Sequence, residues 1–391
     1  MKLFHTADWH LGKIVQGVYM TEDQRYVLEQ FMAAVEAERP DAVIISGDLY
    51  DRAVPPTEAV DLLDEVLERI VVDLETPVLA IAGNHDSPDR ISFGTKMMES
   101  RGLYLAGEIG ANNKAVVIND TFGAVHFHLI PYADPAQVRY VLGDDSIRTH
   151  DDAMRALVDR IEVGLDSKAR HVLVGHAFVT PTGAPENNTS ESERPLAIGG
   201  AEHVSATYFK SFQYTALGHL HQAHFVLNDT IRYAGSPLKY SLSEENHSKG
   251  FYIVDIDGDG SVVVEKRELK PQRDLRSIEV TLDDLEKQPI NEDYVYVTLL
   301  SDHPVLYPME KVRASYPNAM HVGRRNLTKS AEMEARNIAG TEVLQRRSET
   351  NPVQLFEAFY QEVKGLPLSD EKKLLFSEQL GTLLREEGGT Q

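Results

Sequence analysis

The first half of the chain repeats one unit, in which a short β-branched run ends in polar residues and a helical stretch leads to the next run. The first three runs are KLFHTADWH, DAVIISGDLYD and TPVLAIAGNHD. Apolar residues recur at helical spacing over Gln24–Arg39 and Thr57–Leu74, and we expect the second helix to begin with a Thr cap after Pro55-Pro56. This alternation of strands and helices constrains the fold most strongly, because it predicts a parallel sheet.

The pattern changes to hairpin-like alternation between Lys114 and Pro131, which predicts antiparallel strands that join the sheet or form a second one. Another helix is expected over Asp151–Gly164, and further strands follow up to Leu269. The polar stretch from Pro181 to Pro195 is a long loop, and we expect it to border a substrate groove.

Pro271 marks an expected domain boundary. A smaller α/β piece follows, then a polar and charged stretch without an apolar face, and finally two amphipathic helices near Pro352–Val363 and Ser369–Arg385. The sequence therefore predicts four parts, namely a main domain over 1–270, a small domain over 271–326, a linker over 327–351 and a helical tail over 352–391.

The absence of cysteine among the 391 residues excludes disulfides and thiolate metal sites, so any metal here must bind oxygen and imidazole ligands. The apolar runs are far shorter than a membrane span, and the start of the chain does not have the pattern of a signal peptide. We therefore expect a cytoplasmic protein that does not enter a membrane.

The net charge of −22 argues against a protein that grips DNA alone, because phosphate binding normally needs a basic surface. Divalent ions invert the local charge of an acidic pocket, and a partner subunit can supply phosphate contacts. We expect weak DNA binding by the isolated chain.

Residue types that bind metals follow five apolar runs. Asp8 and His10 form D-x-H, and alternation along an extended backbone would place both side chains on the same side. A carboxylate has two oxygens and can bridge two cations, which makes Asp48 the candidate bridge. The full set, each element of it closing a run, is Asp8, His10, Asp48, Asn84, His85, His176, His219 and His221.

Each of these motifs alone is weak evidence, since a lone His is more often packed in a core than bound to a metal. Five such run ends in one chain, most of them preceded by Gly, rarely arise from packing. The conjunction predicts a metal centre.

The motifs D-x-H, G-D, G-N-H-D, G-H and G-H-x-H, in this order, resemble the calcineurin-type metallophosphoesterase superfamily. The chain is also similar to bacterial SbcD nuclease subunits from Lys2 to about Leu269. The segments that carry this similarity are FHTADWHLG, GDLYD, IAGNHDSP, VGHAFV, ALGHLH and YAGSP. The resemblance implies an α/β metallophosphoesterase sandwich of two mixed β-sheets flanked by helices, with a small α/β capping domain and a C-terminal helical tail.

The same resemblance implies the site. One metal would be bound by Asp8, His10, Asp48 and His221, and a second by Asp48, Asn84, His176 and His219. His85 would protonate or stabilise the leaving oxygen, a role that suits imidazole. The metals would be two divalent ions, with Mn²⁺ favoured over Mg²⁺, Fe²⁺ or Zn²⁺. Some archaeal relatives have a histidine where this chain has Asp51, whose role stays open, with a loop or supporting residue preferred.

The implied function is a two-metal DNA phosphodiesterase, the nuclease subunit of an SbcC–SbcD complex. Such a subunit acts as exonuclease and endonuclease on duplex ends and hairpins in DNA repair, recombination and replication. Its partners would be DNA and an SbcC-type coiled-coil ATPase bound by the C-terminal helices, in a heterotetramer that contains an SbcD homodimer. The alternatives are a metallophosphatase or cyclic-nucleotide phosphodiesterase acting on small substrates, and a scaffold with a vestigial site.

Three further features have simpler interpretations. His126 and His128 lie on one face of an expected strand, and we expect them to pack rather than to bind metal. The segment Asp255–Lys266 resembles the first half of a calcium loop, but it ends in Lys and lies between strands, so we interpret it as a hairpin turn. The basic cluster around Arg324-Arg325 can contact phosphates or belong to a solvated linker.

Overall fold

The computed structural model describes residues 1–110, 114–166, 168–184, 190–193 and 202–326, together with a few residues between 356 and 379. Contacts divide the chain into two units, one of Met1–Leu300 with Pro304–Arg324 and one of Ser301–His303 with Arg325–Gln391. The predicted linker over 327–351 lies outside the described residues, as do most of the two terminal helices. In the second unit the rings of Phe356 and Phe376 stack with their centroids 4.0 Å apart.

The first sheet contains the strands that the repeated unit predicts. Strands β1 (Lys2–Thr6), β4 (Ala42–Ile45), β5 (Val78–Ile81) and β6 (Leu103–Ala106) are parallel neighbours. β4 and β5 are buried along their whole length, which explains their continuous apolar runs. The hairpin of β15 (Gly250–Ile256) and β16 (Val262–Glu268) adds antiparallel strands at the edge next to β1. Asp255–Lys266 lies in this hairpin, as predicted.

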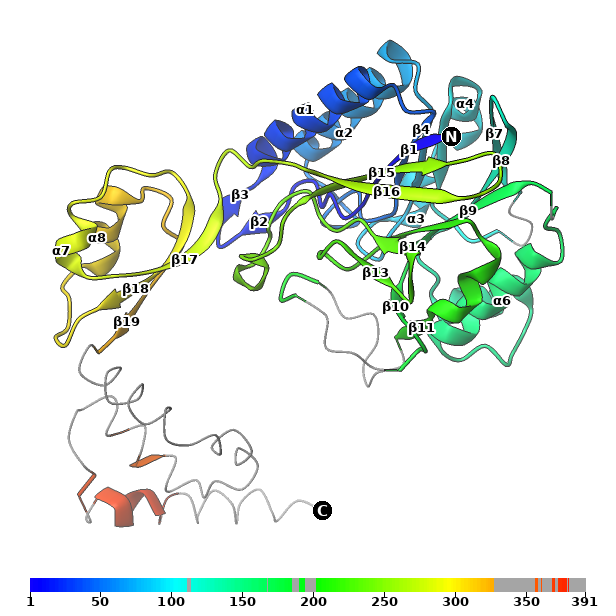
Figure 1. The fold of residues 1–391 in the computed structure, drawn as a ribbon. Coiled ribbons are helices and arrows are strands. Elements are labelled where there is room, and N and C mark those ends of the chain that lie inside the picture. The colour runs from blue at the N-terminus through cyan, green and yellow to red at the C-terminus, as the bar shows by residue number, and fades with distance from the viewer. Residues whose placement is uncertain are drawn as a thin grey trace. The chain divides into compact units, whose positions relative to one another are not determined.

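Helices α1 (Thr21–Glu38) and α2 (Thr57–Glu68) pack on this sheet (Figure 1). α2 continues as a π-helical turn over Arg69–Asp73. The predicted Thr cap is wrong, because Pro56 holds the cap position in an extended conformation and Thr57 is already the first helical residue. A proline at this position restricts the backbone in a way that suits a helix start, so no side-chain cap is required.

The second sheet is mixed as well. Strands β8 (Gly123–Ile130), β9 (Arg170–His176), β12 (Tyr214–Gly218) and β14 (Asn228–Tyr233) are parallel neighbours. β7 (Val116–Asp120) and β13 (His224–Val226) close its two edges in antiparallel pairing. Helices α5 (Pro135–Leu142) and α6 (His150–Glu162) cover the outer face.

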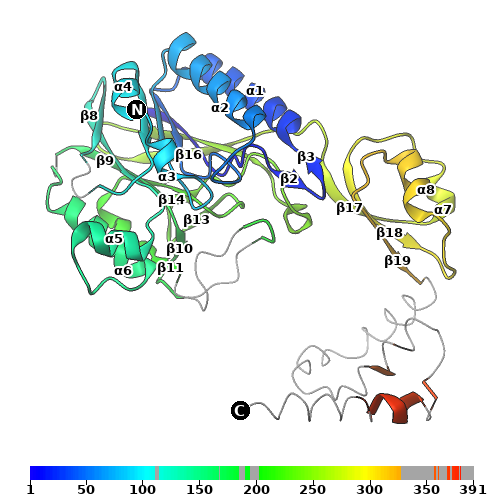
Figure 2. The same ribbon diagram turned by 180° about the vertical axis from the view of Figure 1, so that it is seen from behind.

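The two sheets pack face to face, as Figures 1 and 2 show from opposite sides. Leu3, Ile44 and Leu79 of the first sheet share one buried cluster with Phe127 and Val172 of the second. Because each sheet has helices on its other face, both are shielded from water on both sides. The predicted α/β sandwich of two mixed β-sheets is confirmed.

A smaller three-stranded sheet follows the sandwich. It contains β17 (Leu275–Val280), β18 (Tyr294–Leu300) and β19 (His321–Arg325), with α7 (Leu282–Leu285) and α8 (Pro308–Ser315). Asp23 of α1 accepts hydrogen bonds from Arg273 at 3.0 Å and from the Tyr294 hydroxyl at 2.7 Å. The four predicted domain limits stay a prediction.

The remaining short elements lie in connections. They are β2 (Ile14–Val15), β3 (Val18–Tyr19), α3 (Pro88–Ile91), α4 (Thr95–Met98), a 3-10 turn over Glu99–Arg101, β10 (Phe178–Thr180), β11 (His203–Ser205), and 3-10 turns over Ala206–Ser211 and Leu242–Glu244. Among the described residues, no helix has the length and apolarity that crossing a membrane requires.

Candidate metal centre

Asp8 and His10 follow β1, and both are buried at 0% and 1% exposure. Their φ angles of 53° and 47° are left-handed, so the expected alternation along an extended strand is wrong. The loop after β1 bends here, and the backbone N–H groups of Asp8 and His10 donate to the carbonyls of Gly47 and Asp48. A non-glycine residue in this conformation costs free energy, and such residues concentrate at functional sites.

Asp48 lies at the centre of the candidate site. Its Oδ2 is 3.6 Å from Nε2 of His10 and 3.4 Å from Nε2 of His176. Its Oδ1 accepts the backbone N–H of His85 at 2.9 Å. Asp48 thus lies between an imidazole that follows the first sheet and one that ends a strand of the second sheet.

Asn84 contacts the two histidines that the second sheet contributes beside it. Its Oδ1 is 3.0 Å from Nε2 of His176 and 3.3 Å from Nδ1 of His219. The backbone N–H of His219 donates to Oδ1 of Asp8 at 2.9 Å. The site therefore brings together His176 on β9, His219 after β12 and Asn84 after β5.

His221 faces His10, with their Nε2 atoms 3.0 Å apart. The other ring nitrogen of His221, Nδ1, is 3.2 Å from Oε1 of Glu244 and 2.8 Å from Oγ of Ser192. The described residues 190–193 of the predicted polar loop also reach His221 through Glu193, whose Oε1 accepts its backbone N–H at 2.6 Å.

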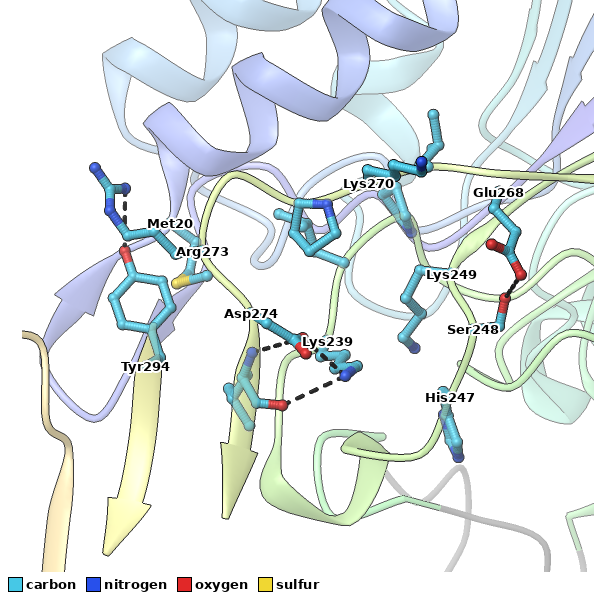
Figure 3. A pocket seen from close by; sticks show the side chains of 15 residues that line it. Met20, Lys239, His247, Ser248, Lys249, Glu268, Lys270, Arg273, Asp274 and Tyr294 are labelled. Atoms are coloured by element: carbon cyan, nitrogen blue, oxygen red, sulfur yellow. Dashed lines mark hydrogen bonds and ion pairs between the residues drawn. The ribbon is translucent and has the colours of Figure 1, made fainter. Parts of the chain in front are cut away.

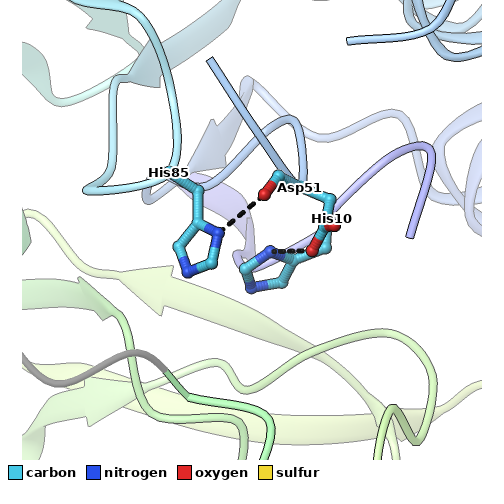
Figure 4. A group of neighbouring side chains, drawn as sticks. All are labelled: His10, Asp51 and His85. Atoms are coloured by element: carbon cyan, nitrogen blue, oxygen red, sulfur yellow. Dashed lines mark hydrogen bonds and ion pairs between the residues drawn. The ribbon is translucent and has the colours of Figure 1, made fainter. Parts of the chain in front are cut away.

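His85 lies beside His10, with ring centroids 4.7 Å apart and nearly perpendicular planes. Its Nδ1 is 2.7 Å from the backbone carbonyl oxygen of Asp51. Figure 4 shows this contact and the Asp51 carboxylate, which is 3.6 Å from Nδ1 of His10 and 2.8 Å from Nζ of Lys13. Asp51 therefore contacts both histidines, one by its backbone and one by its side chain.

Two glycines allow these segments to approach so closely. A Cβ atom on Gly83 would lie 2.1 Å from Oδ1 of Asp48, and one on Gly218 would lie 1.9 Å from the carbonyl oxygen of Ser46. Both distances are too short for any side chain. The glycines of the G-N-H-D and G-H-x-H motifs thus permit the packing that forms the site.

The ring nitrogens and carboxylate oxygens of the site show which atoms could hold a cation. Nδ1 of His176 is 2.8 Å from the carbonyl oxygen of Ser46, which only accepts, so Nδ1 carries a proton. Nε2 faces the oxygens of Asp48 and Asn84, so it holds a second proton there when no cation is bound and offers a lone pair when one is. Oδ2 of Asp8 and Nδ1 of His10 are buried without a hydrogen-bond partner. A cation among these atoms would satisfy them, so the residues present fit a metal site.

The pKa shifts have the same cause. Burial, reinforced by the negative charge of Asp48, raises the pKa of Asp8 to about 7. Burial also acts on His176, but the carboxylates of Asp48 and Asp8 outweigh it and raise the pKa of this ring to about 9. Crowded carboxylates hold protons because their negative charges repel each other. A divalent cation can replace those protons. Two groups with metal-ligand spacing occur in the described residues, namely Asp8, Asp48 and His176, and His10, Asp51 and His85.

Three supporting residues escaped the sequence analysis. Asp86 accepts the backbone N–H groups of Gly83, Leu49 and Tyr50, which ties two site loops together. The side-chain amide of Gln24 donates to the carbonyl of His10, and Glu244 contacts His221. Asp86 was visible as the last letter of G-N-H-D, whereas Gln24 and Glu244 follow no motif.

Two other features lie apart from this centre. His128 packs against His171, with Nε2 and Nδ1 3.1 Å apart, and the ring centroid of His126 is 5.2 Å from that of His171, so the predicted packing is confirmed. A cavity of about 380 Å³, shown in Figure 3, is lined by residues such as Lys239, Lys249 and Arg273. None of the eight candidate residues lines it.

The chain matches the model of the calcineurin-like phosphoesterase family over residues 1–223. Residues 271–364 match a second model, described as the type 5 capsule protein repressor C-terminal domain. The SbcD subunit of the SbcCD nuclease of Staphylococcus epidermidis is 33% identical, over 99% of this chain and 100% of its own.

Two solved structures share less identity with the chain. A protein from Thermus thermophilus is 9% identical, with a TM-score of 0.38, over 68% of this chain and 98% of that one. A dimetal phosphatase from Danio rerio is 12% identical, with a TM-score of 0.39, over 68% of this chain and 96% of that one.

The family model covers more than half of the chain, so the protein belongs to the calcineurin-like phosphoesterases, hydrolytic enzymes that use divalent metals. The full-length match to the staphylococcal protein then places it in the SbcD group within this family.

Proposed function

We propose that the protein is a two-metal DNA phosphodiesterase and the nuclease subunit of an SbcC–SbcD complex. The observation that carries the proposal is the convergence of the candidate side chains around Asp48, from the ends of strands in both sheets. The full-length similarity to a nuclease subunit supports DNA as the substrate.

The proposed metal ligands divide into two groups that share Asp48. Asp8, His10, Asp48 and His221 would hold one ion, and Asp48, Asn84, His176 and His219 the other. Such ions, when bound, activate water and neutralise charge on phosphate oxygens. Oxygen and imidazole ligands without sulfur favour Mn²⁺ and are compatible with Mg²⁺, Fe²⁺ or Zn²⁺.

His85 is the proposed catalytic residue. Because the Asp51 carbonyl only accepts, Nδ1 of His85 donates to it and the ring orientation is held. Nε2 is then the atom that exchanges a proton with the leaving oxygen. The proposal makes His85 a proton donor beside the metal site, and not a ligand.

We also propose the predicted division into a nuclease domain, a capping domain, a linker and a partner-binding tail. The match of residues 271–364 to a separate family model supports a distinct C-terminal part. The tail would bind the coiled-coil base of an SbcC-type ATPase, within a heterotetramer that contains a homodimer of this chain. The partner would supply the phosphate contacts that a chain of net charge −22 lacks.

The test compares substrates on the purified chain with and without its ATPase partner. We expect Mn²⁺-dependent cleavage of end-labelled duplex and hairpin DNA, and hydrolysis of bis-p-nitrophenyl phosphate in preference to the monoester. Cleavage of the monoester alone would favour the metallophosphatase alternative. If neither DNA nor either ester is cleaved, the scaffold alternative stands.

A further inference from the structure

A buried ion pair lies behind His221, in a segment to which the sequence analysis assigned no role. Glu244 is 0% exposed and Lys249 is 7% exposed. Glu244 ends a short 3-10 turn, and Lys249 directly precedes β15. Burying two charges costs desolvation that their attraction does not reliably offset, so such a pair is weak evidence of a role in stability.

The carboxylate of Glu244 holds the ring of His221. Its Oε1 is 3.2 Å from Nδ1 of His221, and the same oxygen accepts from the hydroxyls of Ser192 and Ser241. Because an ionised carboxylate only accepts, Nδ1 of His221 must carry the ring proton. Nε2 therefore keeps its lone pair and directs it toward His10.

Lys249 holds the backbone of the same residue. Its ammonium donates to the carbonyl oxygen of His221 at 2.9 Å, to Oγ of Ser236 at 2.8 Å and to Oε2 of Glu244. All three N–H donors of the ammonium are thus used. Glu244 and Lys249 thus bind each other, while Glu244 contacts the ring of His221 and Lys249 contacts its main chain.

We propose that Glu244 and Lys249 form a positioning unit for His221 and thereby set the affinity of one of the two metal ions. This inference rests on the proposed metal site. A carboxylate that receives the second ring N–H of a ligating histidine fixes its tautomer and orientation, and its loss typically weakens metal binding by about 10–100-fold. His176 is held differently, by the uncharged carbonyl of Ser46.

A second buried ion pair provides a matched control. Asp120 and Arg170 lie on β7 and β9, with side chains 5% and 6% exposed and an N···O distance of 2.5 Å. Asp120 also pairs with the N-terminal ammonium of Met1, and Arg170 donates to the carbonyl of Gly123. A substitution at Asp120 removes a buried carboxylate of the same kind without changing a contact to His221.

The experiment measures Mn²⁺ binding to the chelator-treated full chain by calorimetry, with the melting temperature of the metal-free protein beside it. The variants are Glu244→Gln, Glu244→Asp and Asp120→Asn. For Glu244→Gln we expect about 10–100-fold weaker binding of one ion and unchanged binding of the other. Glu244→Asp should recover part of the loss. Asp120→Asn should bind both ions with wild-type affinity, even if its metal-free melting temperature falls as much as that of Glu244→Gln.

A double variant, Glu244→Gln with Lys249→Met, covers the case in which an unpaired Lys249 prevents folding of the single variant. Lys249 lines the cavity in Figure 3, and Met is close to Lys in length and volume but has no charge. The double variant should show the same selective weakening of one ion.

Wild-type affinity for both ions in Glu244→Gln or in the double variant would overturn the positioning role. Equal loss of one ion in Asp120→Asn would overturn it too, because the effect would then reflect general destabilisation. A wild-type chain that does not bind two ions would refute the metal site itself. Binding to the wild-type chain is therefore measured before any variant.

Discussion

The two sheets of the sandwich contribute different chemistry to the same site. Strands of the first sheet end in Asp8, Asp48 and Asn84, which provide all the candidate oxygen ligands. Strands of the second sheet end in imidazoles, at His176, His219 and His221. The first wall, the charged wall, therefore carries both carboxylates together with His10, and the candidate ligands of the second wall are all imidazoles. Neither wall has a complete ligand set, so the packing of the two sheets creates the site.

The walls also differ in how their backbones are held. Asp8, His10 and Asp48 all have left-handed φ angles near 50°. On the other wall His219 alone of the three histidines has a positive φ angle, of 108°, and His176 is the last residue of a regular strand. Each left-handed residue costs about 1–3 kcal/mol and persists only where its surroundings enforce it. The charged wall thus holds more of the strained residues, and perturbing it should have the larger effects.

The largest effect should come from Asp48→Ala, which removes the carboxylate between the two walls. We expect loss of tight Mn²⁺ binding and a decrease in DNA cleavage of at least roughly 10³-fold, because several kcal/mol of charge stabilisation disappear. Calorimetry and a nuclease assay measure the two effects. Retention of two tightly bound ions would show that Asp48 is not the bridge.

His85→Gln should separate chemistry from metal binding. We expect kcat to fall by about 10²–10⁴-fold, because a proton donor is lost. Both ions should stay bound, because His85 contacts Asp48 through its backbone N–H, which the substitution keeps. Normal cleavage by this variant would refute the catalytic assignment, whereas loss of metal would make His85 a ligand.

Gly83→Ala tests the close approach on the charged wall. Its Cβ would collide with Asp48, and we expect a loss of roughly 1–3 kcal/mol in unfolding free energy, as for overpacked cores. Gly164→Ala is the control, since a Cβ there would meet only a carbonyl oxygen at 3.7 Å. Chemical denaturation of both variants measures the difference in unfolding free energy. Equal values would mean that the loop around Gly83 shifts to accommodate the Cβ atom without loss of stability.

The smallest effect concerns a histidine of the second sheet outside the site. Burial, together with His171 and His126, lowers the pKa of His128 from 6.5 to about 4. The unfolded chain therefore takes up this proton at higher pH than the folded chain, and stability falls as the pH drops from about 6.5 toward 4.

Between pH 7 and pH 5 we expect His128 to account for a loss of about 1–2 kcal/mol. His128→Gln keeps a polar group beside His171 but does not titrate. Its stability should therefore depend less on pH in denaturation curves at the two values. An unchanged pH dependence would mean that His128 titrates normally in the folded chain.

Much of the fold was readable because strand and helix periodicity are local properties of the chain. The alternation of runs predicted the parallel strands, and the segment from Lys114 to Pro131 predicted the antiparallel hairpin of β7 and β8. The eight candidate site residues were likewise visible as polar residues at the ends of apolar runs. Their roles as ligands and as proton donor stay predictions.

Other features arise only from contacts between distant segments. The left-handed backbone at Asp8 and His10 was missed, because the loop after β4 and not the local sequence enforces it. Glu244 was missed, because a buried carboxylate in a Ser-rich turn has no periodic or motif signature.

The sequence by itself therefore determined which residue types end each strand, since that information is contiguous along the chain. Only the tertiary structure decided that the carboxylates of one sheet face the imidazoles of the other. It also decided that Glu244 and Lys249 hold His221, because burial and ion pairing depend on segments that meet only after folding.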